Sequence, residues 1–103
     1  MTDSIKIMGL VGTGVMGAGI AQIAAQAGVL VRLFDARDGA AQTARDSLGT
    51  TLSKLAAKGK ITQAAVDATL ENLQVAATIE ALHDCDLVVE AIVENLDAKR
   101  GLL

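Results

Sequence analysis

Hydrophobic residues occur along the chain in two alternating patterns, short mostly apolar runs and longer stretches with three- and four-residue spacing. The apolar runs predict strands at residues 5–11, 29–34, 73–76 and 86–93. The spaced stretches predict helices from residue 15 to about 27, over 38–58, from 62 to about 70, and from 97 onward. This alternation, with continuous apolar strands, is typical of a parallel sheet covered on both faces. We therefore predict an α/β, doubly wound fold.

Glycines and one threonine mark the expected helix ends. Gly28 stands where a left-handed cap of the first helix is expected, and Gly59 ends the long second helix. Thr62 is suited to cap the amino terminus of the third helix. The chain stops about seven residues into the final expected helix, after four strands where a doubly wound sheet commonly has about six. We expect one domain over residues 1–103, truncated after its fourth strand.

Composition narrows the class of protein. Hydrophobic residues make up 51% and charged residues 20%, which excludes a disordered tail. The net charge is −3 and Phe34 is the only aromatic residue, so we expect no nucleic-acid partner. A single cysteine, Cys85, apolar runs too short to span a bilayer and no signal peptide lead us to expect a cytoplasmic protein without a membrane partner.

The segment 12–17, G-T-G-V-M-G, matches the G-x-G-x-x-G pattern between an expected strand and an expected helix. In this context Gly12 permits the tight turn, Gly14 allows a pyrophosphate to approach the backbone, and Gly17 lets the helix pack closely on the strand. The free amides of the first helical turn, at Val15, Met16 and Gly17, then bind phosphate. The alternative is that these glycines serve only the turn and the packing.

Asp35 ends the second expected strand, 18 residues after Gly17, where an acidic side chain accepts hydrogen bonds from the adenosine ribose. A carboxylate there repels a 2′-phosphate, so we predict NAD rather than NADP as the cofactor. Arg37 weakens this inference, because a nearby arginine can accommodate the 2′-phosphate; it can also pack beside the adenine or face solvent. A second alternative for Asp35 is a solvated residue at a strand end.

With these residues in place, the chain resembles the amino-terminal domain of the 3-hydroxyacyl-CoA dehydrogenase family over nearly its whole length. Four stretches carry the resemblance: G-T-G-V-M-G-A-G-I-A-Q from residue 12, L-F-D at 33–35, L-S-K-L-A-A-K-G-K-I-T at 52–62 and D-L-V-V-E-A-I-V-E-N at 86–95. The last is the most specific, because V-V-E-A-I-V-E is not shared by dinucleotide-binding proteins in general. The resemblance implies that Ala91 and Ile92 line the ribose and nicotinamide side of NAD, and that Glu94 and Lys99 contact it.

The basic end of the second helix is the candidate site for coenzyme A. Thr51 and Lys58 are seven residues apart and share a helix face, with Lys54 nearly on that face. In the family, a hydroxyl and a lysine at the positions matching Thr51 and Lys58 contact the CoA moiety. The alternative is that these lysines are ordinary surface residues near a helix carboxyl terminus.

The resemblance implies an enzyme that oxidises a (3S)-3-hydroxyacyl-CoA to the 3-oxoacyl-CoA in fatty-acid or phenylacetate breakdown. It places the catalytic histidine and its glutamate partner beyond Leu103, so we expect this chain to bind NAD without catalysis. His83 and Cys85 are expected to be structural, and no metal-ligand spacing is present. An exposed edge of the fourth strand favours pairing with a second chain, and we expect a homo-oligomer, a dimer.

Two other interpretations use the same loop. One is a dinucleotide-dependent sensor or structural module without chemistry, which the sequence after Leu103 would distinguish by lacking the histidine and glutamate. The other is a hydroxyacid or imine reductase, which is not expected to carry V-V-E-A-I-V-E or the lysine-bearing helix end.

Overall fold

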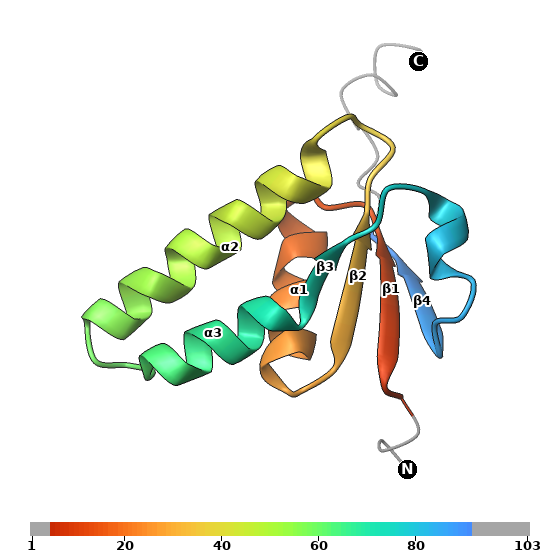
Figure 1. Ribbon diagram of the computed structural model, residues 1–103. Helices are drawn as coiled ribbons and strands as arrows, with labels where there is room; N and C mark the ends of the chain where they lie inside the picture. The colour runs from red at the N-terminus through yellow and green to blue at the C-terminus, as the bar shows by residue number, and fades with distance from the viewer. Residues whose placement is uncertain (1–4, 92–103) are drawn as a thin grey trace, which may run out of the picture.

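Four parallel strands form one sheet in the order β3-β2-β1-β4 in the computed structural model, which describes residues 5–91. The elements in chain order are β1 (Ile7–Val11), α1 (Val15–Gln26), β2 (Leu30–Phe34), α2 (Ala40–Ala57), α3 (Gln63–Glu71), β3 (Leu73–Val75), the 3₁₀ helix η2 (Ile79–Leu82) and β4 (Leu87–Glu90). The chain passes from β1 outward to β2 and β3, then returns across the sheet to β4 (Figure 1). This order confirms the predicted α/β fold.

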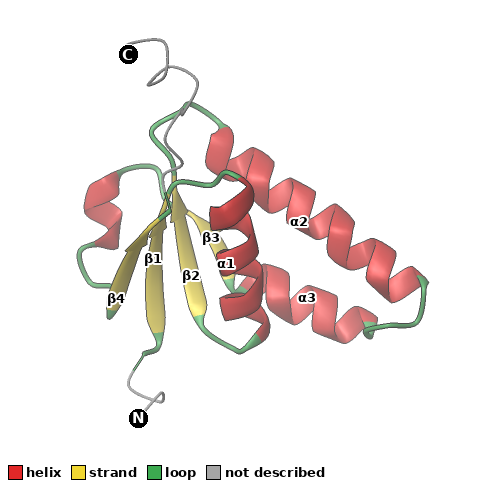
Figure 2. Ribbon diagram, turned by 180° about the vertical axis from the view of Figure 1, so that it is seen from behind, coloured by secondary structure: helices red, strands yellow, loops and turns green. Residues whose placement is uncertain are grey.

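The helices α1, α2 and α3 lie together beside the sheet, as Figure 2 shows from behind. Small and branched apolar side chains fill the core between α1 and the sheet, with Leu10, Val31 and Leu33 fully buried opposite Ala21 and Ala25. On the other face, Leu82 of η2 packs over Gly9, whose missing side chain leaves it room. Within residues 5–91, therefore, full helices cover one face and η2 covers part of the other.

Arg32 is a charged residue within the otherwise apolar strand β2, and its partners lie on this second face of the sheet. Arg32 donates a hydrogen bond to the carbonyl oxygen of Ala81 (3.1 Å) and forms an ion pair with Asp84. Asp86 accepts hydrogen bonds from the backbone amides of Lys6 and Ile7, at 2.8 and 2.9 Å. These contacts join the segment before β4 to β1 and β2, and so set the position at which β4 begins. The 3₁₀ helix η2 is not among the elements that the sequence predicts.

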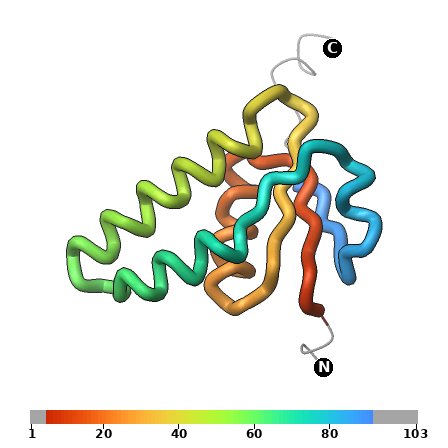
Figure 3. The backbone as a smooth tube through the Cα atoms, in the orientation of Figure 1, coloured from red at the N-terminus to blue at the C-terminus, as the bar shows by residue number. Residues whose placement is uncertain are grey.

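The caps of the helices match the sequence predictions. Gly28 and Gly59 both adopt positive φ, at 95° and 76°, directly after α1 and α2. The Thr62 hydroxyl accepts a hydrogen bond from the amide of Ala65 (3.1 Å) at the start of α3. Figure 3 follows the chain along α2, through the turn at Gly59, and back along α3. Arg45 of α2 fixes this hairpin through hydrogen bonds to the carbonyl oxygens of Leu73 and Leu70.

The fourth strand is shorter in the structure than predicted. It spans Leu87–Glu90, whereas residues 92 and 93 of the predicted run and the helix expected from residue 97 lie outside the described residues. Within the described part of the chain β4 pairs with β1 alone, and its Leu87 and Val88 side chains are exposed. No helix within residues 5–91 is long and apolar enough to cross a membrane.

Candidate functional site

The glycine-rich loop lies at the carboxyl end of β1, where the chain turns from the sheet into α1. Gly12 takes a φ of 97°, a conformation that side chains disfavour, and its amide donates to the carbonyl oxygen of Phe34 (2.8 Å). Gly14 is the residue immediately before α1. The turn therefore lies beside the carboxyl end of β2, as the paired residues Val11 and Phe34 require.

Gly14 and Gly17 are required for different physical reasons. A Cβ at Gly17 would stand 2.0 Å from the carbonyl oxygen of Gly12, so only glycine lets α1 pack this closely on the loop. At Gly14 no atom lies within 4 Å of the position of a Cβ, so the backbone there borders open space. The structure thus shows the close packing predicted for Gly17, while approach of a pyrophosphate at Gly14 stays a prediction.

The first turn of α1 presents backbone donors to that space. The first intrahelical hydrogen bond runs from the amide of Ala18 to the carbonyl oxygen of Gly14 (2.8 Å), so the amides of Val15, Met16 and Gly17 precede it. Gly14 contributes no side-chain cap to them. Amides of this kind, at the positive end of a helix dipole, are suited to binding phosphate oxygens.

A pocket of about 340 Å³ opens beside the glycine loop that precedes α1. It is lined by the ends of three elements and their loops, at Val11, Gly12, Thr13, Gly14, Asp35, Ala36, Arg37 and Ala91. Ala91 follows β4 directly, is buried, and is held to β1 through its amide, which donates to the carbonyl oxygen of Val11 (2.8 Å). The pocket thus lies at the carboxyl ends of the parallel strands, between β1 and β4, where doubly wound folds bind ligands.

Asp35 is the acidic residue of this pocket, and its carboxylate accepts five hydrogen bonds. Oδ2 accepts from the amide and the hydroxyl of Thr13 (2.8 and 2.9 Å) and from Arg37 Nη2 (2.9 Å). Oδ1 accepts from the amide and Nε of Arg37 (2.9 and 3.0 Å). The Asp35 side chain is 6% exposed, whereas that of Arg37 is 69% exposed.

These hydrogen bonds stabilise the ionised form of the Asp35 carboxyl group. Those from Arg37 first, and then those from Thr13, hold the pKa of Asp35 far below its usual range, although burial alone would raise it. The same pair raises the pKa of Arg37. Asp35 is therefore a carboxylate at neutral pH, the form that accepts hydrogen bonds from ribose hydroxyl groups.

Two residues of this network were not recognised in the sequence. Thr13 was considered only as a variable position within the glycine pattern, yet it contributes two of the five donors to Asp35. Arg37 faces solvent, one of the alternatives the sequence offered, and in addition pairs with Asp35, a contact that was not predicted. The spacing Asp-x-Arg could have indicated the second contact, because an aspartate side chain commonly accepts from the amide two residues on. Nothing in the local sequence indicates the first.

The two residues predicted to contact coenzyme A belong to the α2 segment. Thr51 lies on α2 and lines a groove of about 570 Å³ between α1 and α2 that begins at Thr13, Gly14 and Arg37. Lys58 is exposed and immediately follows α2, which extends well past the sheet in Figure 1. Lys54, expected on nearly the same face, instead lines a separate groove between α2 and α3.

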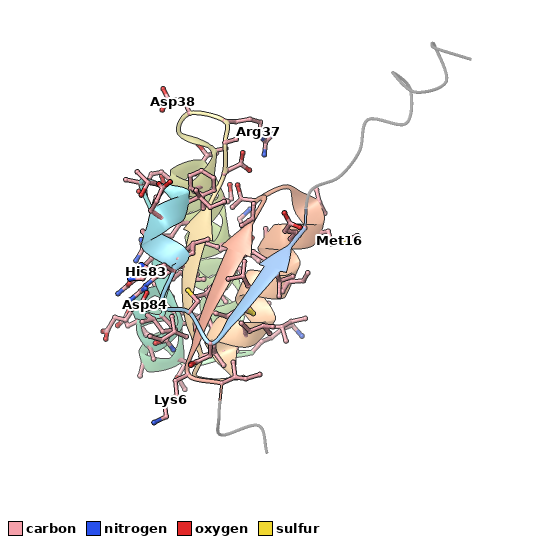
Figure 4. The ribbon with its side chains drawn as sticks, turned by 90° about the vertical axis from the view of Figure 1, so that its right-hand side faces the viewer. Lys6, Met16, Arg37, Asp38, His83 and Asp84 are labelled. Carbon is pink, nitrogen blue, oxygen red and sulfur yellow. The ribbon has the colours of Figure 1, made fainter. Side chains whose placement is uncertain are left out.

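His83 and Cys85 lie outside the pocket. His83 follows η2, near the end of the sheet at which β4 begins. Its Nδ1 lies 2.9 Å from the carbonyl oxygen of Glu80. Figure 4 shows it well separated from Arg37. A Cβ at Gly9 would lie 3.1 Å from the Cys85 sulfur, which places this thiol against the sheet. Residues 5–91 contain no group of three or more potential metal ligands.

Three residues predicted to contact the cofactor, Ile92, Glu94 and Lys99, lie outside the described residues. Within the described residues, the predicted dinucleotide site consists of the glycine loop, Asp35 and Ala91. A gap at Gly14, free amides at α1 and an ionised acceptor at the end of β2 together suit the pyrophosphate and ribose of NAD.

Comparison with known proteins identifies the family to which the chain belongs. A family model described as "3-hydroxyacyl-CoA dehydrogenase, NAD binding domain" matches residues 7–103. A probable 3-hydroxybutyryl-CoA dehydrogenase of Bacillus subtilis is 40% identical over 95 residues, covering 92% of this chain and 33% of the relative. A 3-hydroxyadipyl-CoA dehydrogenase of Escherichia coli is 36% identical over 102 residues, covering 99% of this chain and 22% of the relative.

Solved structures give the same result. The crystal structure of 3-hydroxybutyryl-CoA dehydrogenase from Escherichia coli superposes with a TM-score of 0.83 at 37% identity, over 95% of this chain and 21% of that one. The chain spans about a third of the length of the first curated relatives it matches.

Proposed function

Because the chain belongs to the 3-hydroxyacyl-CoA dehydrogenase family, whose NAD-binding-domain model it matches over residues 7–103, we propose that it holds NAD for the oxidation of a (3S)-3-hydroxyacyl-CoA. The observation that carries the proposal is the pocket at the end of β1, where the open space at Gly14 meets the ionised Asp35. Both curated relatives named above are described as acting on a 3-hydroxyacyl-CoA. The product would be the 3-oxoacyl-CoA.

In this proposal each described residue has a role in binding. The amides of Val15, Met16 and Gly17 bind the pyrophosphate, and Gly14 leaves room for it. Asp35 accepts hydrogen bonds from the adenosine ribose, and Ala91 lines the side of the cofactor toward β4. Bound NAD supplies the hydride acceptor, and the protein supplies orientation and electrostatics. Ile92, Glu94 and Lys99 are proposed to contact the cofactor further along the chain.

Titration of the 103-residue chain with NADH, followed by fluorescence, tests the cofactor site. We expect saturable binding that is at least tenfold tighter for NADH than for NADPH, about 1.4 kcal/mol, because Asp35 repels a 2′-phosphate. The chain lacks Trp and Tyr, so it adds almost no background. A folded chain, verified by circular dichroism, that binds neither nucleotide would contradict the assignment.

The same sample tests the expectation that binding occurs without catalysis. The single histidine, His83, lies near the end of the sheet at which β4 begins, away from the pocket. Incubation with acetoacetyl-CoA and NADH should therefore give no loss of NADH absorbance. Any turnover by the pure chain would disprove this part of the proposal.

Lys58 and Thr51 are proposed to contact the coenzyme A part of the substrate. Replacing Lys58 by Glu should weaken acetoacetyl-CoA binding about tenfold or more, since one charge-assisted contact to a phosphate contributes roughly 1.5–3 kcal/mol. Chemical-shift changes in an NMR titration would report such binding even when it is weak. The Lys60→Glu variant is the matched control, because it changes the net charge equally and lies two residues away. Equal weakening in both variants would mean that Lys58 makes no specific contact.

A further inference from the structure

The carboxylate of Asp35 is fully occupied before any cofactor binds. It accepts five hydrogen bonds, whereas two carboxylate oxygens offer about four lone-pair sites. A ribose presents two further hydroxyl donors. At least one present donor must therefore leave Asp35 when a dinucleotide occupies the pocket.

The five donors differ in how freely they can leave. The Thr13 amide and the Arg37 amide are backbone groups held by the loops after β1 and β2, and Thr13 is buried with its hydroxyl on Asp35. The Arg37 guanidinium contributes the remaining two donors from a long side chain that is 69% exposed. Its ion pair can break with no change in the backbone, and the exposed guanidinium remains hydrated when it does. The guanidinium is thus the group that a ribose displaces.

The groove between α1 and α2 can receive the displaced guanidinium. Arg37 lines both the dinucleotide pocket and the adjoining groove between α1 and α2. The described residues that line this groove include no carboxylate, and Thr43 and Ser47 contribute hydroxyl groups to it. Arg37 also borders a third hollow, on the β3 side of Asp35, which the carboxylate of Asp38 lines. A guanidinium leaving Asp35 toward α2 therefore meets hydroxyl groups and no negative charge from the groove lining.

We propose that Arg37 sets the cofactor selectivity of this chain by exchanging between Asp35 and the 2′ position of the adenosine ribose. With NADH, the ribose hydroxyls take Asp35 and Arg37 moves aside. With NADPH, Arg37 pairs with the 2′-phosphate and offsets its repulsion by Asp35, so NADPH still binds measurably, though more weakly. The inference rests on the proposed NAD site and adds that discrimination against NADPH is weaker than Asp35 alone would impose.

Paired titrations of NADH and NADPH into the wild-type chain and the Arg37→Gln variant test this. We expect the ratio of the two dissociation constants, NADPH over NADH, to rise about tenfold or more in the variant, because a charge-assisted contact to the phosphate is lost. NADH affinity should stay equal or increase. Lys60→Gln removes the same charge in the turn after α2, and should leave the ratio unchanged within about twofold, because at physiological salt charges are screened beyond roughly 8 Å.

Several results would overturn the proposal. An unchanged ratio in Arg37→Gln, or equal weakening of both nucleotides, would mean that Arg37 does not discriminate between them. A wild-type chain that binds NADPH more than about a thousandfold more weakly than NADH would leave no role for Arg37. These outcomes leave the NAD site intact, whereas a folded wild-type chain that binds neither nucleotide would refute the site and this inference together. Circular dichroism of each variant verifies its folding, and Arg37→Lys, with charge but no planar fork, should retain part of the NADPH binding.

Discussion

Replacing Gly17 by alanine is expected to destabilise the chain by about 2 kcal/mol or more, the largest effect of any single methyl group at the site. The added Cβ would stand 2.0 Å from the carbonyl oxygen of Gly12, and this neighbour is backbone that cannot rotate away. Either α1 must move off the sheet or the glycine loop must open. Thermal unfolding followed by circular dichroism should show a midpoint lowered by roughly 8–16 °C for a chain of this size.

Gly19 offers a matched control within the same helix. It is also a helical glycine of α1, but no atom lies within 4 Å of the position of its Cβ. Gly19→Ala therefore gains helix propensity, about 0.5–1 kcal/mol, with no clash, and its midpoint should rise slightly. If both alanine variants unfolded at the same temperature, the close approach of α1 to the loop would not be what requires glycine at position 17.

Replacing Gly14 by valine is expected to weaken NADH binding roughly a hundredfold while leaving the fold in place. Gly14 has a φ of −70° and a ψ of −166°, values open to any residue, and a side chain there meets no protein atom within 4 Å of its Cβ. The valine would instead fill space beside the first-turn amides of α1, where the pyrophosphate is proposed to lie. Losing one or two hydrogen bonds to a charged phosphate gives a loss of roughly a hundredfold in affinity.

In the Gly14→Val variant the affinity for NADH should fall while the unfolding midpoint changes little. The cost of losing glycine before α1 is expected to stay below about 1 kcal/mol, so the unfolding midpoint should fall by only a few degrees. Fluorescence titration with NADH gives the second readout. Binding of NADH at wild-type affinity by Gly14→Val would show that the dinucleotide does not approach the backbone at this residue.

The predicted elements agree with the structure where the signal is local. Apolar runs identified all four strands, and three- and four-residue spacing identified α1, α2 and α3 to within about two residues at each end. Gly28, Gly59 and Thr62 were correctly identified as caps, because a positive φ or a hydroxyl acceptor is a property of one residue and its nearest neighbours. The 3₁₀ helix η2 was missed, since a four-residue segment is too short to show a period.

At the site, the amino-acid sequence alone supplied the glycine loop, the acidic residue at the end of β2 and the family, because each is written in residue types at a regular spacing. Only the tertiary structure determines which hydrogen bonds the Asp35 carboxylate accepts. Its bonds to Thr13 span 22 residues and exist because β1 and β2 pair with Val11 beside Phe34, which brings both strand ends together. The separation of Thr51 and Lys54 into different grooves likewise depends on where α1 and α3 pack against α2. Spacing indicates which residues can share a face, whereas packing determines what that face meets.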